Sequence, residues 1–457
     1  MKRQGLFVAI LSPLICCMTT NSHAQQTVTN FCPYANHLNS LACLVPDLTR
    51  TGTSNLAAIN TTLAQVVGQL PLAVPVSGFI LGIDAKTGVP VDINQNLGSV
   101  LTERGSTLGK RKLFLGFTYQ HFVFQTIDGR KLNDLPTVFF DANSGLYGSD
   151  TASLSANVSQ YTAIAAFGLT DRIDISATLP FQRVSIAAGH TLASVTDALG
   201  NSRTPTQSDC SSNPQNFPGQ CPQSLGGSAS GVGDLLLNIK GSIINHERSK
   251  LAMGMETRFP TGDAYNLLGS GAYGVRPYIV FSRYVNRLTP HVNVGYQWNG
   301  FSVLRINPCF FSSDTNVKKV CQNGSLPTLR LPDDIEYSGG ADIGIVKKLS
   351  LVVDLVGQHF FNAPQVTRAL PASQAGIPGV PLANPQGTAS QMSNLNALNS
   401  SPTVGIANGN YDVVNLGLGL KWNPVQHLII SGNVLLKLND NGLRSKYVPL
   451  VGISYKF

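Results

Sequence analysis

Alternation of apolar and polar residues, from about residue 112 onward, limits the possible folds more than any other feature of the chain. Between 291 and 298, for example, four apolar residues alternate with His, Asn, Gly and Gln. Because successive side chains of a strand point to opposite faces, each such segment has one apolar face. The pattern predicts about twelve strands, near residues 112–125, 152–167, 173–185, 231–244, 250–259, 275–284, 289–298, 335–346, 349–358, 411–422, 428–437 and 446–457.

The lengths of the connections separate two all-β folds that alternation alone allows, a soluble sandwich and a membrane barrel. Short turns, such as 168–172 and 347–348, alternate with long connections near 126–151, 186–230, 260–274, 299–334, 359–410 and 438–445. Short turns on one rim and long loops on the other are typical of outer-membrane barrels. We therefore expect residues 111–457 to form a transmembrane antiparallel β-barrel of about 12 strands, with both of its ends on the short-turn side.

Composition agrees with a barrel. Only 12% of the residues are charged, against about 25% in an ordinary soluble protein, and the outward faces of the clearest strands carry no charge. Mean hydropathy of +0.07 is too low for a bundle of membrane helices. The net charge of +8 is spread along the chain without a Lys/Arg cluster, so no nucleic-acid partner is expected. The expected partner is lipid of the outer membrane.

Residues 1–24 have the parts of a secretory signal peptide. Lys2 and Arg3 precede an apolar stretch that is too short to span a bilayer, and Ser22-His23-Ala24 offers small residues for cleavage after Ala24. A lipoprotein signal through Cys16 or Cys17 and a buried N-terminal helix are the alternatives. The leader predicts export across the inner membrane to the outer membrane of a Gram-negative cell.

Six cysteines remain after such cleavage, in three pairs that are close in sequence. In an oxidising compartment they are expected to form disulfides, although six cysteines allow about 15 connectivities. The predicted local pairs are Cys32 with Cys43, Cys210 with Cys221, and Cys309 with Cys321.

Residues 25–110 precede the predicted barrel. Apolar residues at helical spacing after Thr53-Ser54 predict one amphipathic helix near 54–70. The segment could fold inward as a plug of the pore, or extend into the periplasm and pack on a partner. The plug is slightly favoured, because the apolar face of the helix needs a surface to pack against.

The inward faces of the strands carry polar residues of both charge signs, which does not indicate a strongly ion-selective pore. They are interpreted either as a network that holds the barrel round or as a path for solute. Phe114 and Val352 also face inward. The loop near 369–409, which is rich in Pro, Ala, Ser, Asn and Gly, is expected to be mobile. It could fold into the mouth of the barrel as a constriction or remain solvated outside. The candidate lumen residues are Asp234, Asn238, Lys240, Glu256, Arg258, Asp342, Asp354, Gln358 and Lys421.

Catalytic motifs do not emerge from the sequence. There is no G-x-S-x-G, P-loop or H-E-x-x-H, so no catalytic residue, metal or cofactor is expected. An outer-membrane hydrolase would need an outward-facing Ser–His pair or an acidic–His group at the rim, and no such pair is apparent in the predicted register. A structural or adhesion barrel without transport is the other alternative to a channel.

Several short motifs, in order, resemble a known family. They include Phe167-Gly168-Leu169-Thr170-Asp171-Arg172, Gly231-Val232-Gly233-Asp234-Leu235, Phe259-Pro260-Thr261-Gly262-Asp263 and His291-Val292-Asn293-Val294-Gly295-Tyr296. Together they are similar to the outer-membrane transporters of the MetA-pathway of phenol degradation family, over roughly residues 110–457. The resemblance implies a passive channel for small organic molecules, aromatic or hydrophobic ones among them. The C-terminal strand, which ends in Phe457, resembles the signal that barrel-assembly machinery recognises.

Overall fold

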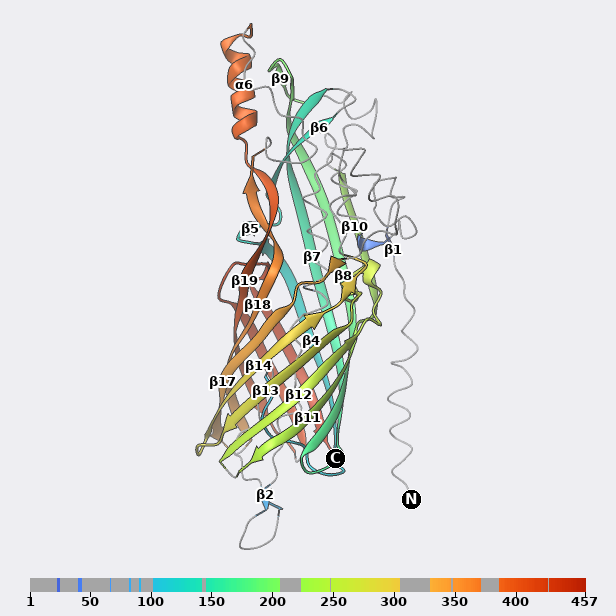
Figure 1. Ribbon diagram of the computed structural model, residues 1–457, viewed down its shortest axis with the longest axis vertical. Coiled ribbons are helices and arrows are strands. Elements are labelled where there is room, and N and C mark those ends of the chain that lie inside the picture. The colour runs from blue at the N-terminus through green and yellow to red at the C-terminus, as the bar shows by residue number, and fades with distance from the viewer. Residues whose placement is uncertain are drawn as a thin grey trace.

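Twelve antiparallel strands close into one barrel in the described part of the chain (Figure 1). The computed structural model describes residues 23–24, 40–42, 66, 82–83, 90–91, 102–141, 145–205, 223–246, 248–304, 329–346, 348–370, 386–425 and 427–457. The barrel strands are β4 (Leu113–Ile127), β7 (Leu146–Gly168), β8 (Ile173–Asp197), β10 (Gln223–Val232) continued by β11 (Leu235–Asn245), β12 (Ser249–Phe259), β13 (Gly274–Arg283), β14 (Leu288–Asn299), β17 (Asp334–Val346), β18 (Leu349–Ala369), β19 (Thr403–Trp422), β20 (Leu428–Lys437) and β22 (Tyr447–Lys456).

The last strand closes the barrel by pairing with the first. β22 pairs with β4 from Leu450 opposite Gln120 to Lys456 opposite Phe114. The amide of Phe457 donates to the carbonyl of Leu113 over 2.8 Å, which places the two ends of the barrel together on the short-turn rim. This pairing joins the first and last strands of the barrel, as a sheet in hydrocarbon requires. Each predicted strand overlaps a barrel strand, and the predicted fold class is confirmed.

Short elements complete the described structure. They are β1 (His23–Ala24), β2 (Gly82–Ile83), β3 (Pro90–Val91), β5 (Arg130–Lys131), β6 (Leu135–Asp141), β9 (Ser202–Arg203), the 3-10 helix η2 (Ala264–Asn266), β15 (Phe301–Ser302), β16 (Leu329–Arg330), α6 (Ala389–Ser400) and β21 (Leu443–Ser445).

Several strands are longer than the sequence predicted. β7, β8, β18 and β19 have 23, 25, 21 and 20 residues, whereas β12, β13 and β14 have 11, 10 and 12. The long strands rise past the short ones in Figure 1. The extensions were taken for loops because an extracellular hairpin needs no apolar outer face, so the alternation that marks a strand in lipid fades there.

The prediction of a loop at 369–409 is wrong over α6 and the start of β19. Thr388 and Gln391 form a capping box at the start of α6, which satisfies backbone donors there. Leu395 and Leu398 of α6 are buried against Val138 of β6 and Tyr147 of β7. This packing holds the helix above the long-strand side of the barrel.

The outer face of the barrel is apolar. Met253, Val292 and Val451 are 56%, 52% and 55% exposed. Exposure of this kind is expected of side chains that contact lipid in the membrane. Trp298, near the long-loop end of β14, and Trp422, at the short-turn end of β19, are both exposed on this face. Aromatic side chains at the two ends of an apolar band are the interfacial girdles of a membrane barrel.

Other predictions fall outside the described residues. The leader apart from His23 and Ala24, all six paired cysteines, and the helix near 54–70 apart from Val66 lie there. Within the described part of the chain, no helix is long and apolar enough to cross a membrane.

Candidate functional site: the barrel lumen

The predicted lumen residues lie on the strand faces opposite the exposed apolar residues. Six of them have side chains that are at most 5% exposed: Asp234, Lys240, Arg258, Asp342, Asp354 and Lys421. Asn238, Glu256 and Gln358 are partly exposed. Phe114 and Val352, also predicted to face inward, are 0% and 1% exposed. The structure does not gather these residues in one place but divides them among three groups along the barrel.

The first group lies near the short-turn rim and is built around Arg104. This guanidinium forms an ion pair with Asp342 of β17, and both side chains are fully buried. His291 Nε2 lies 2.9 Å from Asp354 Oδ1, and His291 Nδ1 lies 3.6 Å from Asp342 Oδ2. Lys421 is within electrostatic range of Arg104 and both carboxylates. Sequence reasoning found the two aspartates and Lys421 but missed Arg104, which precedes the strands.

Arg104 belongs to residues 102–110, which we call the lumen segment. Its neighbour Glu103 accepts from Lys240 Nζ of β11 over 2.6 Å. The amide of Gly105 donates to Ser282 Oγ of β13 over 3.1 Å, and the amide of Leu108 donates to Asp174 Oδ2 of β8 over 2.7 Å. With Asp342 of β17, four strands bind the segment, so it lies inside the barrel near the short-turn rim.

Gly105 shows how closely the lumen segment approaches the wall. A Cβ atom at this position would lie 2.5 Å from the carbonyl oxygen of Lys250 on β12. Because that oxygen belongs to the backbone of a paired strand, it has little freedom to move away. A residue with a side chain would therefore shift the lumen segment from its place.

The second group forms an ionic ladder in the middle of the lumen. Arg276 of β13 pairs with Glu256 of β12 over 2.9 Å and with Glu336 of β17. The Tyr278 hydroxyl donates to Asn238 Oδ1 over 3.0 Å. Charged side chains inside a barrel are tolerated when they pair and hydrogen-bond. This ladder gives the wall formed by β11 to β17 a polar inner face.

The third group fixes the connection between β12 and β13. Asp234 Oδ2 accepts from both the amide and the hydroxyl of Ser270, over 2.8 and 2.6 Å. Arg258 donates to Asn299 Oδ1 and lies 3.9 Å from Asp234 Oδ2. Asp234 and Arg258 thus hold a loop in place. This role agrees with the interpretation of the inward residues as a structural network, and not with a path for solute.

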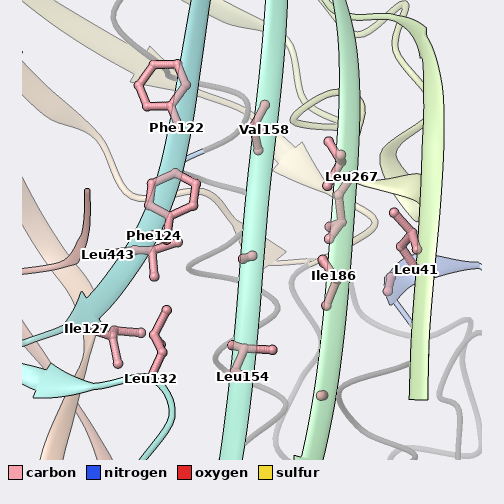
Figure 2. Close-up of a cluster of buried hydrophobic side chains, with 14 of the residues drawn as sticks. Leu41, Phe122, Phe124, Ile127, Leu132, Leu154, Val158, Ile186, Leu267 and Leu443 are labelled. Atoms are coloured by element: carbon pink, nitrogen blue, oxygen red, sulfur yellow. The ribbon is translucent and has the colours of Figure 1, made fainter. Parts of the chain in front are cut away.

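The wall formed by β18 to β22 and β4 is apolar toward the long-loop end. Figure 2 shows Phe122 and Phe124 of β4 on the same side as Val158 of β7 and Ile186 of β8. Beside this cluster is a pocket lined by side chains that include Phe122, Phe124, Phe360, Tyr411 and Arg444. Sequence reasoning missed this pocket. The signal that could have shown it is the run of aromatic residues at inward positions, 122 and 124.

Parts of the N-terminal region also lie within the barrel. Leu41 and Ala42 are 1% and 0% exposed and belong to the cluster in Figure 2, and Val66 lines the pocket. The amide of Leu41 donates to Asn266 Oδ1 over 3.3 Å. Together with the lumen segment, three stretches of this region therefore contact the inner face.

One Ser–His pair, which the sequence reading did not recognise, is present on the outer face. His121 Nδ1 of β4 lies 3.0 Å from Ser159 Oγ of β7, and the two residues are directly opposed across the strands. Their 38-residue separation in sequence hid the pair. Among the described residues no carboxylate pairs with His121, so the third group of a catalytic triad is missing there. The same residues contain no cluster of His, Cys, Asp and Glu that could hold a metal ion.

Comparisons with known proteins give a family match over part of the chain. The family described as "Putative MetA-pathway of phenol degradation" matches residues 137–308, which confirms the resemblance drawn from the sequence motifs. No curated protein matches the chain. Among solved structures, the COG4313 outer membrane channel from Pseudomonas putida F1 is 13% identical, with a TM-score of 0.41, covering 79% of this chain and all of the other. A Pseudomonas aeruginosa FadL homologue is 9% identical, with a TM-score of 0.30, over 86% and 97% of the two chains.

Proposed function

We propose that this chain, whose residues 137–308 match the MetA-pathway of phenol degradation family, is an outer-membrane channel for passive uptake of small organic compounds that carry an apolar ring. The closed barrel with an apolar exterior supports the outer membrane as its location. The leader at 1–24 supports export from the cytoplasm. The terminal strand, in which Tyr455 and Phe457 stack edge to face at 4.7 Å, is proposed to be the part that the barrel-assembly machinery binds.

The observation that carries the proposal is the apolar pocket inside the barrel. A lumen for hydrophilic solutes has polar walls throughout, whereas this lumen has an ionic wall on β11 to β17 and an aromatic wall on β18 to β4. Burying apolar surface stabilises a bound solute by about 25 cal/mol per Å². An aromatic ring that contacts this wall is therefore stabilised by burial of its apolar surface, whereas a sugar has little apolar surface to bury.

The polar lumen residues then have different proposed roles. Asn238, Glu256 and Gln358 are partly exposed and are proposed to line the solute path. Asp342 and Lys240 are proposed to hold the lumen segment, and Asp234 and Arg258 the β12–β13 connection, because they contact these parts of the chain. Asp354, 2.9 Å from His291 Nε2, and Lys421 are proposed to support the group around Arg104.

The N-terminal region is proposed to narrow the pore. Contacts of Leu41, Val66 and the lumen segment with the inner face support a plug. A periplasmic extension would leave these side chains outside the barrel.

Uptake of radiolabelled phenol by Gram-negative cells with and without the chain tests the proposal. At limiting concentrations we expect the cells that make the protein to take up phenol several times faster, with uptake of labelled sucrose unchanged. Equal rates for phenol with and without the protein in the outer membrane would contradict a channel for such compounds.

The Ser–His pair allows a test of the alternative function, a lipid hydrolase. If the barrel were a lipid hydrolase, purified protein would release fatty acids from phospholipid vesicles, and Ser159→Ala would abolish that release. We expect no release from either protein, because no acidic group orients His121. Release of fatty acids that depends on Ser159 would contradict the proposed channel function and support an enzyme.

A further inference from the structure

The pocket in the apolar wall has a polar end that the proposed function does not use. Arg444 and Ser445 of β21 both line the pocket and are 4% and 8% exposed. The same pocket is also lined by the aromatic side chains of Phe122, Phe124 and Tyr411. The site therefore combines a buried cation with aromatic rings.

The rings belong to three different strands. Phe122 and Phe124 of β4 have ring centroids 6.0 Å apart with planes at 17°, and Phe360 of β18 lies 5.2 Å from Tyr411 of β19 at 38°. All four side chains are at most 6% exposed. Aromatic pairs at these separations interact favourably, and a further ring in the pocket can make the same kind of contact with them. The apolar part of the site fits a small flat molecule.

At the polar end, two donor atoms have no acceptor among the described residues. Arg444 Nη2 donates to the carbonyl of Val414 over 2.7 Å and to Asn415 Oδ1 over 2.9 Å. Arg444 Nε and Ser445 Oγ are buried and have no hydrogen-bond partner among the residues that the structure describes. A buried donor without a partner has lost its hydrogen bond to water and gained none in return, so two on adjacent residues at one pocket favour a ligand with acceptor oxygens.

The charge of Arg444 is also not balanced by an ion pair. Arginine is protonated at physiological pH, and Arg444 forms no ion pair within the described residues. The charge of the Asp440 carboxylate acts on Arg444, but Asp440 forms its ion pair with Lys437. A ligand that brings its own negative charge would complete the site.

We propose that this pocket binds an aromatic carboxylate. The ring lies among Phe122, Phe124, Phe360 and Tyr411, and the carboxylate oxygens accept from Arg444 Nε and Ser445 Oγ. This inference rests on the proposed channel function, since it names the solute class that the channel holds on its way through. The pocket lies toward the long-loop end of the lumen, where a solute that enters from outside the cell arrives first.

Calorimetric titration of the purified full-length protein in detergent tests the site, with benzoate and its neutral analogue benzyl alcohol as probes. We expect benzoate to bind about tenfold more tightly or better, because a hydrogen bond to a charged group adds about 1.5–3 kcal/mol. Arg444→Gln should remove that preference, so that the two probes bind about equally. Arg368→Gln, which changes an exposed arginine on β18, is the matched control and should bind both probes as the unchanged protein does.

Equal affinities for the two probes would overturn the proposal, and so would benzoate affinity that is unchanged by Arg444→Gln in a folded barrel. Ordered water would then be the partner of the two donors. If Arg444→Gln does not fold, Ser445→Ala serves instead and should lower benzoate affinity alone. Binding is measured without transport, so the two proposals fail separately. Phenol uptake without benzoate binding rejects the site, and benzoate binding without uptake rejects the channel.

Discussion

Replacing Arg104 with alanine is expected to raise the single-channel conductance of the purified protein in planar bilayers several-fold. The change removes one partner of a fully buried ion pair, which costs about 3–5 kcal/mol because the Asp342 carboxylate loses the guanidinium that pairs with it. Because the lumen segment is held by only a few such contacts, that cost is enough to release it from the barrel. Water and ions then fill the space, and the negative charge becomes hydrated.

Lys110→Ala is the matched control for this experiment. Lys110 is in the same segment and carries the same charge, but its side chain is exposed and only its amide contacts the barrel, at Asp171 Oδ1 over 3.0 Å. The conductance of the Lys110→Ala protein should equal that of the unchanged protein. Deletion of residues 25–110 sets the upper limit. If the deletion leaves conductance unchanged, the N-terminal region does not narrow the pore, and the plug proposal is wrong.

A lysine on the lipid face should destabilise the barrel strongly. Met253, in the middle of β12, is 56% exposed and lies opposite Ile279 of β13. A lysine at the midplane of a membrane barrel costs about 2–4 kcal/mol, so Met253→Lys should lower the free energy of unfolding in lipid by that amount. Urea unfolding of the protein in phospholipid vesicles measures the difference.

Met253→Leu separates the effect of charge from that of any substitution. It keeps an apolar side chain in lipid and should change the free energy of unfolding by far less than the lysine. If Met253→Lys unfolds at the same urea concentration as Met253→Leu, residue 253 does not face hydrocarbon and the assignment of the outer face is wrong.

The sequence predicted the barrel well because lipid imposes a simple rule on each strand. Every second side chain between Val292 and Trp298 must be apolar, so strand and register can be read from one pattern. The extensions of β7, β8, β18 and β19 face water, where the rule does not apply, and there the sequence predicted loops. Helix α6 was missed for a related reason, since its two buried leucines, Leu395 and Leu398, contact strand extensions that were not expected.

The interior was predicted less well, because its contacts join residues that are far apart in sequence. Inward parity located Asp342, Asp354 and Lys421, but it could not show that Arg104 lies among them, 238 residues away from Asp342. The aromatic pocket was missed because Phe360, Tyr411 and Arg444 come from connections, or the edges of connections, that were predicted to be loops. Parity gives the face of a strand that a residue occupies, and only the closed barrel shows what lies across the lumen.

Fluorescence quenching by brominated lipids tests most directly whether the apolar outer face lies in a bilayer. The chain has two tryptophans; Trp298 and Trp422 are 43% and 50% exposed near opposite ends of the barrel. In vesicles, the single-tryptophan variants Trp298→Phe and Trp422→Phe should each be quenched strongly, and more by bromine near the headgroups than by bromine at the chain ends, because interfacial girdles lie at that depth. Quenching by aqueous iodide alone, with none by brominated lipid, would contradict the membrane barrel and the channel with it.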